Sequence, residues 1–344
     1  MCAGFERALT GTGSRFRTSC RVLSSGRNSR NATDTILGVD IGGTKTALFA
    51  TARATGEKIA ATTFDTPRDV GPTAMIAVLQ RESEAMLLAA GVEPRSIRAV
   101  GCAVPGQVDG DGLVIGAGNL KWDRVPLREQ IEAAWQVPAF VEQDANAGAL
   151  GEMWRGVAQT MSDFVFVALG TGVGAGIVLG RRLHRGARHA AGELGDLVPD
   201  PRALGRGPRD EHNLASRIGS RALRTHAREA TGDEIRAADV VSGAAADARL
   251  GAIARDLAAD LAIVVIAIAA VLDPEAIILG GGTSTGGEAL VSRVMARVKP
   301  ELFREPVLVL AALGEEAQLY GAVAGAMARL DPDFVLAGPV RRTS

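Results

Sequence analysis

Two glycine-rich turns constrain the fold of this 344-residue chain more than any other feature of its sequence. The apolar segments 36–41 and 46–50 each predict a strand. The turn between these two strands consists of Gly42, Gly43, Thr44 and Lys45. Because glycine lets the backbone approach a ligand closely, successive amides in such a turn can surround phosphate oxygens, helped by a hydroxyl and an ammonium group. A plain Gly-Gly hairpin is the alternative.

A second turn of the same kind follows the apolar strand predicted for residues 164–169. It begins with Gly170, Thr171 and Gly172, and we expect the next strand to resume at 177–179. Neither turn has the spacing of a P-loop, and neither opens the strand-helix-strand unit of a dinucleotide site. Two such turns predict that the phosphates of a nucleotide are held between two lobes. Asp40, just before the first turn, is a candidate to hold Mg2+ through water.

Asp144 is the candidate for acid-base chemistry. It follows an apolar run at 139–141 and precedes helical sequence rich in Ala and Gly. A carboxylate at the end of a strand that faces a cleft can accept a proton from a substrate hydroxyl. The alternative is that Asp144 only forms the N-cap of the next helix. The two glycine turns on either side of it in the chain favour the catalytic interpretation.

Two loops between these elements are candidates for a sugar site. The strand predicted for residues 97–104 ends in Pro105-Gly106, where a bare backbone permits close approach, although a structural turn is the alternative. Asn119 lies in a glycine-rich loop, and its amide carries both donors and an acceptor, which suits a vicinal diol. Trp122 is either a wall of that pocket or ordinary core.

The second half of the chain predicts a long helix at 250–272, a strand at 276–279, a helix at 288–298 and a last helix at 317–330. An earlier helix is expected at 73–90, where apolar residues recur at helical spacing. The turn before the 288–298 helix consists of Gly280, Gly281 and Gly282. Its position at a helix N-terminus makes it a candidate to support adenosine or phosphate, and a simple strand-to-helix turn is the alternative.

Composition excludes several classes of partner. The chain is 47% hydrophobic and 22% charged, with a formal net charge of -1, so no whole-chain attraction draws it to nucleic acid or to an anionic membrane. Its longest apolar run, 261–272, is well short of the roughly 20 residues that a membrane helix needs. The cysteines at positions 2, 20 and 102 have no paired spacing, which argues against disulfides and for a cytoplasmic setting.

Residues 1–33 differ from the rest because they combine six arginines with many Ser and Thr, and contain a single acidic residue. Such a composition resembles an organellar transit peptide. A disordered extension, or a start codon placed too far upstream, is the alternative. We therefore leave this segment out of the predicted fold.

Taken together, the motifs resemble those of the ROK family of sugar kinases and related repressors, within the actin-like ATPase superfamily. They are DIGGTK (40–45), VPG (104–106), QDANAGALGE (143–152), LGTGVGAGIVLG (169–180), AGELGD (191–196) and LGGG (279–282). The resemblance extends over residues 36–330. It implies an α/β fold of two ribonuclease H-like lobes around a central cleft. The N-terminal lobe would comprise 34–143 and 318–344, the C-terminal lobe would comprise 144–317, and a homodimer would be expected.

The resemblance also implies a function and roles for residues. ATP, with Mg2+, would phosphorylate a hexose, most readily glucose at its 6-hydroxyl; fructose, mannose and N-acetylhexosamines are alternatives. Asp144 would be the base, with Asn119 and Glu193 as partners of sugar hydroxyls. The residue before the base, Gln143, is Asn in most relatives. A further sugar contact would come from Glu211 or His212, which the motif spacing leaves open.

Two departures from the family pattern change what is expected. The position of a usual zinc-binding His is Asp196, and the loop 197–213 contains no cysteine, so no zinc site is expected. The arginines of this loop are interpreted as a solvated surface rather than as paired groups.

Only 39 residues precede Asp40, and they lack a helical apolar period, so the DNA-binding role of the related repressors is not expected. A sugar-binding protein without catalysis is the third alternative, although the candidate base and both turns are intact.

Overall fold

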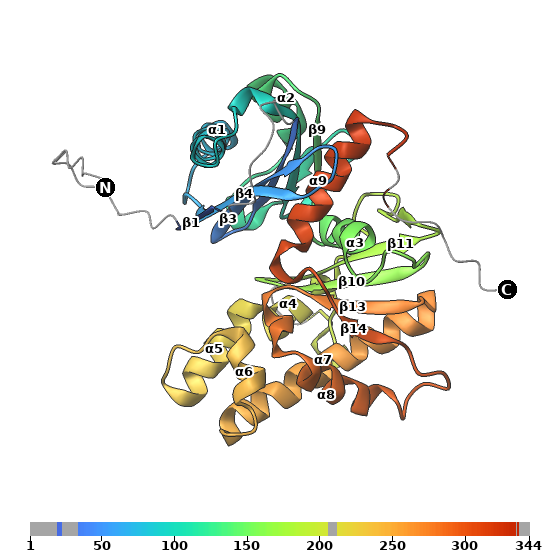
Figure 1. Cartoon of the computed structure of the whole chain (residues 1–344). Helices are drawn as coiled ribbons and strands as arrows, with labels where there is room; N and C mark the ends of the chain where they lie inside the picture. The colour runs from blue at the N-terminus through green and yellow to red at the C-terminus, as the bar shows by residue number, and fades with distance from the viewer. Residues whose placement is uncertain (1–18, 23–33, 206–211, 335, 337–344) are drawn as a thin grey trace.

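The computed structural model describes residues 19–22, 34–205, 212–334 and 336. It is a mixed α/β structure with two large sheets, a small three-stranded sheet and helices packed around and between them (Figure 1). The first large sheet lies above the second in the view of Figure 1, and the helices α3 and α9 lie between the two.

The first sheet has six strands in the order β1-β4-β3-β2-β5-β9. Its strands are β1 (Ser19–Val22), β4 (Lys58–Asp65), β3 (Lys45–Ala52), β2 (Thr35–Ile41), β5 (Ile97–Val104) and β9 (Ala139–Gln143). The strands β2, β5 and β9 are parallel, with Asp40 opposite Ala103 and Val104 opposite Gln143. Since parallel strands end at one edge, the segments that follow these three strands meet there.

The second sheet has five strands in the order β12-β11-β10-β13-β14. They are β12 (Arg182–Leu183), β11 (Val173–Leu179), β10 (Phe164–Leu169), β13 (Ala276–Gly280) and β14 (Leu308–Leu310). β10, β13 and β14 are parallel, and β11 returns antiparallel beside β10. The glycine turns after β10 and β13 therefore lie at the same edge of this sheet.

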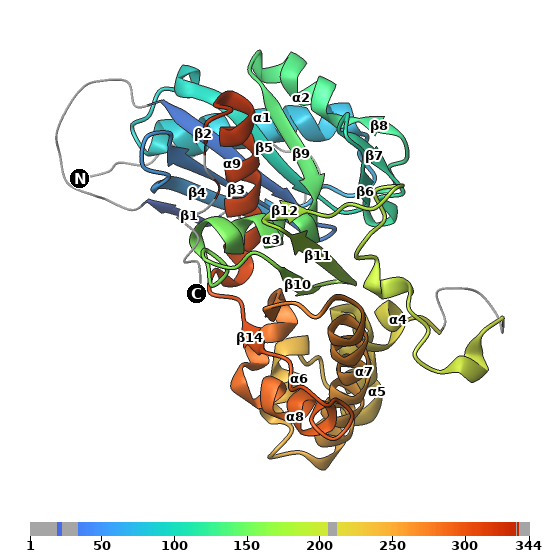
Figure 2. The same ribbon diagram turned by 90° about the vertical axis from the view of Figure 1, so that its right-hand side faces the viewer.

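The helices α3 (Asp144–Arg155) and α9 (Ala317–Leu330) cross in direct backbone contact between the sheets (Figure 2). A Cβ added to Gly321 would lie 1.7 Å from the carbonyl oxygen of Ala147, and one on Gly151 would lie 2.0 Å from that of Ala317. No side chain fits at either position, so glycine allows the crossing. Although α9 comes last in the chain, it packs on β2 and β5 of the first sheet.

The two faces of the first sheet are covered by different helices. Leu37, Val39 and Ile41 of β2 pack in the core beneath α1 (Pro72–Ala89) and α2 (Leu127–Trp135). Ile36 packs instead with Leu319 and Val323 of α9. Because side chains alternate along a strand, Asp40 shares the face of Ile36 and points toward α3 and α9.

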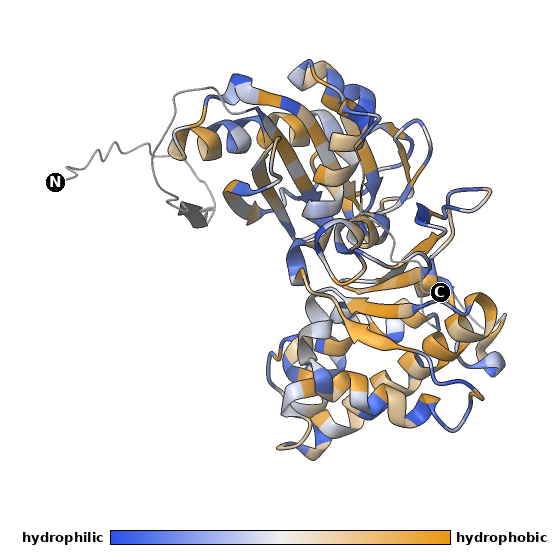
Figure 3. Cartoon of the chain, turned by 45° about the vertical axis from the view of Figure 1, so that its right-hand side comes forward, coloured by the Kyte–Doolittle hydropathy of each residue, from blue (hydrophilic) through white to orange (hydrophobic). Residues whose placement is uncertain are grey.

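The remaining helices cover the second sheet, whose strands are largely apolar (Figure 3). They are α4 (Leu214–Ile218), α5 (Ser220–Thr231), α6 (Ala237–Gly243), α7 (Ala248–Leu272) and α8 (Glu288–Val298). The small sheet consists of β6 (Gln107–Val108), β7 (Leu113–Ile115) and β8 (Val125–Pro126). It follows β5 directly and forms one wall beside the strand ends. Within the described residues, no helix is long and apolar enough to cross a membrane.

Most predicted elements are found, with some changed bounds. The helices predicted at 288–298 and 317–330 are confirmed at these residues, and that predicted at 73–90 occupies 72–89. The strand expected to resume at 177 instead begins at Val173. The glycines of this segment lie within the strand. The strand packs closely on α3 at Gly176, because a Cβ on Gly176 would lie only 2.6 Å from the carbonyl oxygen of Ala145.

Part of the N-terminal segment also belongs to a sheet. Although residues 1–33 were left out of the predicted fold, Ser19–Val22 pairs antiparallel with β4 as an edge strand. The short run has no apolar pattern that would reveal this pairing, which the free edge of β4 provides. The transit-peptide interpretation concerns residues that lie largely outside the described part of the chain, and it stays a prediction.

Candidate functional site

A cavity of about 630 Å3 lies where the strand ends of both sheets face each other. Residues that the sequence analysis assigned to phosphate and to sugar line it together. They are Gly42, Gly43, Gly106, Asn119, Gln143, Asp144, Gly170, Thr171, Gly172, Glu193 and Gly281. These residues are far apart in the chain, and the parallel order of β2, β5 and β9, and of β10 and β13, brings them to one space.

Asp144 lies on the wall of this cavity at the start of α3. Gln143 is the N-cap residue of that helix and makes no side-chain capping bond, so Asp144 is not the cap. Instead Asp144 is the first helical residue, and its Oδ1 accepts from the backbone N–H of Ala145 at 2.7 Å. Burial raises the pKa of Asp144, which that hydrogen bond partly opposes. A carboxylate with a raised pKa is a stronger proton acceptor than an exposed one.

Asp40 is close enough to Asp144 for their charges to interact. Burial, followed by the negative charge of Asp144, raises the pKa of Asp40 to about 7. A buried carboxylate whose ionisation is disfavoured by a second carboxylate forms a site that a cation stabilises. Mg2+ is commonly held by one or two carboxylates together with phosphate oxygens, and this pair fits that pattern. Within the described residues no group of three or more His, Cys, Asp or Glu gathers into a metal site.

The three glycine turns differ in local geometry. The N–H of Gly42 donates to the carbonyl oxygen of Lys45 at 3.0 Å and closes the first turn. At Gly170 and Gly172 a Cβ would meet no atom within 4 Å, so the second turn opens onto free space. Gly281 has a φ of +87°, which favours glycine, and a Cβ there would lie 2.6 Å from the carbonyl oxygen of Leu169. Backbone thus forms the part of the cavity wall that the sequence assigned to phosphate.

Glu193 faces the candidate base from the loop that follows β12. Its Oε1 accepts from Nε2 of Gln143 at 2.8 Å. The N–H of Ala175 in β11 donates to the carbonyl oxygen of Gly192 at 2.7 Å and holds this loop in place. Gly192 has a φ of +91°, and a Cβ there would lie 2.0 Å from the carbonyl oxygen of Ala175. Glycine is therefore required one residue before the carboxylate.

Some predicted site residues do not line the cavity. Asp40 and Gly280 lie behind it, and a Cβ on Gly280 would press on the ring of Phe166 at 2.4 Å. Lys45 is exposed at the start of β3. Gly282 and the half-buried His212 also do not line the cavity. Thr44 lines a neighbouring cavity instead. Glu211 lies outside the described residues, so the choice between Glu211 and His212 stays open.

Other residues on the wall were not assigned by the sequence. Gln107, Asp196 and Gln318 line the cavity. Asp196 was noted only as a replacement for histidine, and the motif spacing could have marked it as a site residue. Gln318 reaches the cavity because α9 returns between the sheets, for which its local sequence has no signal. Arg202 forms an exposed ion pair with Asp200 at 3.0 Å, so the paired alternative, and not the solvated one, applies to this arginine. The other two arginines of that loop lie outside the described residues.

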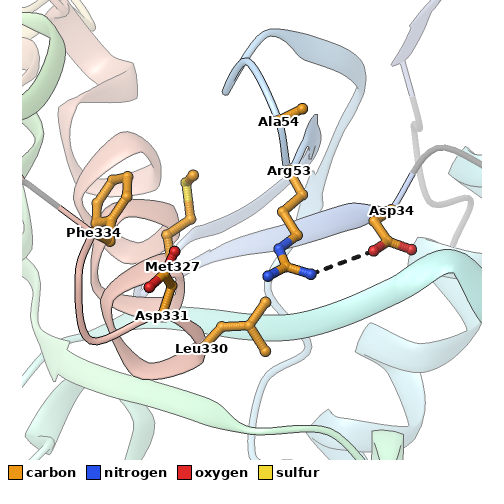
Figure 4. A pocket seen from close by; sticks show the side chains of 7 residues that line it. All are labelled: Asp34, Arg53, Ala54, Met327, Leu330, Asp331 and Phe334. Atoms are coloured by element: carbon orange, nitrogen blue, oxygen red, sulfur yellow. Dashed lines mark hydrogen bonds and ion pairs between the residues drawn. The ribbon is translucent and has the colours of Figure 1, made fainter.

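Cavity size alone does not identify the site. A cavity of about 660 Å3 lies beside the end of α9 (Figure 4). Its walls combine an exposed ion pair, Arg53 with Asp34 at 3.4 Å, with Met327, Leu330 and Phe334. It contains none of the glycine turns, so the cavity at the strand ends is the better candidate for function.

The family model that matches this chain is that of the ROK family, over residues 36–329. The chain belongs to the ROK family. A ROK family glucokinase from Streptomyces griseus, solved in complex with glucose and AMPPNP, is 29% identical, with a TM-score of 0.73 over 85% of this chain and 99% of that chain. This match confirms the predicted α/β fold of the actin-like ATPase superfamily.

Relatives of known name include both kinases and repressors. A glucokinase of Halalkalibacterium halodurans is 28% identical over an alignment of 310 positions, and the match covers 83% of this chain and 92% of that enzyme. A putative xylose repressor of Caldicellulosiruptor sp. is 42% identical over 118 residues, and the match spans 34% of this chain and only 30% of the repressor. The chain is therefore a ROK family kinase or regulator.

Proposed function

We propose that this ROK protein is an ATP-dependent sugar kinase that transfers the γ-phosphoryl group to a hexose hydroxyl, with the 6-hydroxyl of glucose as the first candidate acceptor. The observation that carries the proposal is the single cavity in which Asp144, Asn119 and Glu193 meet both phosphate turns. Phosphoryl transfer needs a proton acceptor, groups that orient the hydroxyl and amides that offset phosphate charge. Asp144, the Asn119–Glu193 pair and the glycine turns would supply them.

In the proposed reaction Asp144 accepts the proton of the sugar hydroxyl. The hydroxyl oxygen forms its bond to the γ-phosphorus as the bond to the bridging oxygen breaks, and ADP leaves. Burial of Asp144 suits this role because it raises the pKa of the carboxyl group. Asn119 and Glu193 would hold neighbouring hydroxyls of the sugar. The hydrogen bond from Gln143 helps to orient the Glu193 carboxylate.

The backbone around Gly42 and Gly170 would contact the phosphates of ATP, and the Gly280–Gly282 turn would lie by the adenosine. Mg2+ held beside Asp40 would offset the charge of the phosphate oxygens. The two lobes would close about the crossing of α3 and α9 and exclude water from the transfer. A homodimer and a cytoplasmic location belong to the same proposal, and light scattering tests the first.

A coupled ADP-release assay tests the kinase proposal over glucose, mannose, fructose, N-acetylglucosamine and N-acetylmannosamine. We expect turnover on at least one sugar and a loss of at least about 100-fold in Asp144→Asn. Asp65→Asn removes an exposed carboxylate outside the cavity and serves as the matched control. Absence of turnover on every sugar would contradict the kinase assignment, whereas full activity of Asp144→Asn would contradict only the assignment of the base.

A sugar-binding regulator without catalysis is the second candidate, and the 42% identity with a repressor over 118 residues favours it. Calorimetry separates the two candidates. Sugar binding in the presence of ATP and Mg2+ without ADP release supports the regulator, and ADP release supports the kinase.

A further inference from the structure

A second cavity, of about 340 Å3, lies directly beside the candidate active site and shares Gly43 and Asn119 with it. Its other walls are the connection from β4 to α1, the loop at 119–122 and the start of α5. Its volume is at the lower end of the roughly 300–1,000 Å3 of small-molecule sites. The proposed phosphoryl transfer uses only the first cavity, so the purpose of the second is open.

Positive charge predominates on the walls of this second cavity, which carry Arg68, Lys121 and Arg221 against the one carboxylate of Asp69. Lys121 is ion-paired with Asp69, and this contact lowers the pKa of that carboxyl group. Arg68 contributes a smaller lowering through its charge. In the described part of the chain, neither Arg68 nor Arg221 takes part in a hydrogen bond or an ion pair. Two guanidinium groups are therefore available to a ligand.

The two arginines come from the parts of the protein built on the two different large sheets. Arg68 follows β4 of the first sheet, whereas Arg221 lies in the first turn of α5, which packs with the helices of the second sheet. The N–H of Ser220 donates to the carbonyl oxygen of Gly170 at 2.9 Å, and this bond fixes the start of α5 to the second phosphate turn. A guanidinium group binds phosphate oxygens through paired N–H donors, so two of them across one cavity match a phosphate group from two sides.

We infer that this second cavity binds a phosphate group through Arg68 and Arg221, beside the first glycine turn, whose Gly43 and Thr44 also line it. We further infer that the phosphorylated sugar is its ligand during turnover. The new phosphate ester would arise beside Gly43, which both cavities share. Asn119 also lines both cavities, so it would contact the sugar whether the sugar lies in the first cavity or in the second. The phosphate site itself is independent of the proposed function, whereas the identity of its ligand as the sugar product rests on it. Inorganic phosphate would bind by the same chemistry.

Calorimetric titration with inorganic phosphate and, separately, with glucose 6-phosphate tests the inference, each in saturating AMPPNP and Mg2+ so that the ATP turns are filled. We expect both probes to bind, and the double variant Arg68→Gln/Arg221→Gln to weaken both affinities at least tenfold. Because both arginines are exposed, the affinities should also fall as salt increases. Arg224→Gln removes an exposed arginine of the same helix that lies off the cavity and should leave both affinities unchanged.

Two outcomes would overturn the site: equal affinity for phosphate in the double variant and the wild type, or no phosphate binding once AMPPNP is bound. Glucose 6-phosphate that binds no more tightly than inorganic phosphate would overturn only the assignment of the ligand. A thermal melt of the double variant that matches the wild type shows that any loss is local. These titrations need no turnover, so they separate the two proposals. If the protein binds phosphate but has no kinase activity, the phosphate site is supported and the proposed function fails.

Discussion

Arg185 forms an ion pair with Glu142, which lies two residues before the candidate base in the chain. Nε and Nη2 of Arg185 donate to Oε2 of Glu142 at 2.9 and 2.5 Å, and the Glu142 side chain is only 2% exposed. The other carboxylate oxygen, Oε1, accepts from the N–H of Gln143 and from Nδ2 of Asn146. The pair thus joins the loop that carries Glu193 to the strand β9, which ends one residue before Asp144.

We predict that Arg185→Gln destabilises the protein by about 2 kcal/mol and weakens sugar binding. The substitution leaves Glu142 buried without its cation, which costs roughly 3–5 kcal/mol in a fully buried pair and less here because Arg185 is partly exposed. Urea unfolding measures the first effect, and sugar calorimetry measures the second.

The double variant Arg185→Gln/Glu142→Gln separates pairing from packing. It should be more stable than Arg185→Gln, because an amide is less costly to bury than an unpaired carboxylate. Arg182→Gln, at an exposed neighbouring position, is the matched control. Wild-type stability and sugar affinity in Arg185→Gln would show that the ion pair positions nothing.

The hydrogen bond from Gln143 to Glu193 leads to a prediction about substrate binding. Gln143→Asn shortens the side chain by one methylene and breaks the 2.8 Å contact, so Glu193 loses one of the contacts that orient it. We expect the KM for the sugar to rise about tenfold in the kinase assay, with a smaller change in kcat, as for the loss of a group that orients a ligand. Gln143→Glu should be worse, since it sets two carboxylates against each other. An unchanged KM in both variants would contradict a role for this contact.

The sequence predicted those parts of the site that consist of a few consecutive residues. Asp144, the Gly42–Gly43 turn and the Gly170–Gly172 turn each follow an apolar strand, and a strand with its turn is a pattern of a few residues. The same reasoning placed α9 at its observed bounds. Relative placement was accessible only through the family resemblance, because the parallel pairing of β2, β5 and β9 joins segments far apart in the chain.

The parts that escaped prediction depend on contacts between distant segments. Arg185 lies 43 residues from Glu142, and nothing near either residue indicates its partner. Gln318 reaches the cavity only because α9 crosses α3. Asp144 was weighed as a helix cap because its sequence position allows that role, whereas the helix begins one residue earlier than a cap at Asp144 would require.

The crossing of α3 and α9 predicts a strong effect of a single methyl group. In Gly321→Ala the new Cβ would lie 1.7 Å from the carbonyl oxygen of Ala147, so the helices must separate. We expect a loss of about 3 kcal/mol in the free energy of unfolding, the upper part of the range for overpacked cores. Gly110→Ala adds the same methyl group where no atom lies within 4 Å, and it should be nearly neutral. Equal urea midpoints for the two variants would contradict the close crossing.

The raised pKa of Asp40 predicts that stability falls as pH rises. Burial and the charge of Asp144 raise this pKa to about 7, so between the ordinary pKa of an aspartate and about 7 the folded protein binds more protons at this site than the unfolded chain does. Stability is therefore highest below the unfolded pKa, decreases by at most about 1.4 kcal/mol per pH unit through this window, and is then constant. Urea unfolding from pH 5 to 8 without divalent cations measures the slope.

Asp40→Asn removes one titrating group and should reduce this slope, leaving the part that comes from the raised pKa of Asp144, with a gain in stability at pH 8 that is lost toward pH 5. Mg2+ should act in the opposite direction on the wild type, because a cation beside the carboxylates favours their ionised form and stabilises the folded protein most at high pH. The same cation should have little effect on Asp40→Asn. Asp65→Asn, which alters an exposed carboxylate on β4 of the same sheet, should retain both the slope and the response to Mg2+. Identical pH slopes for Asp40→Asn and the wild type would rule out Asp40 as the titrating group.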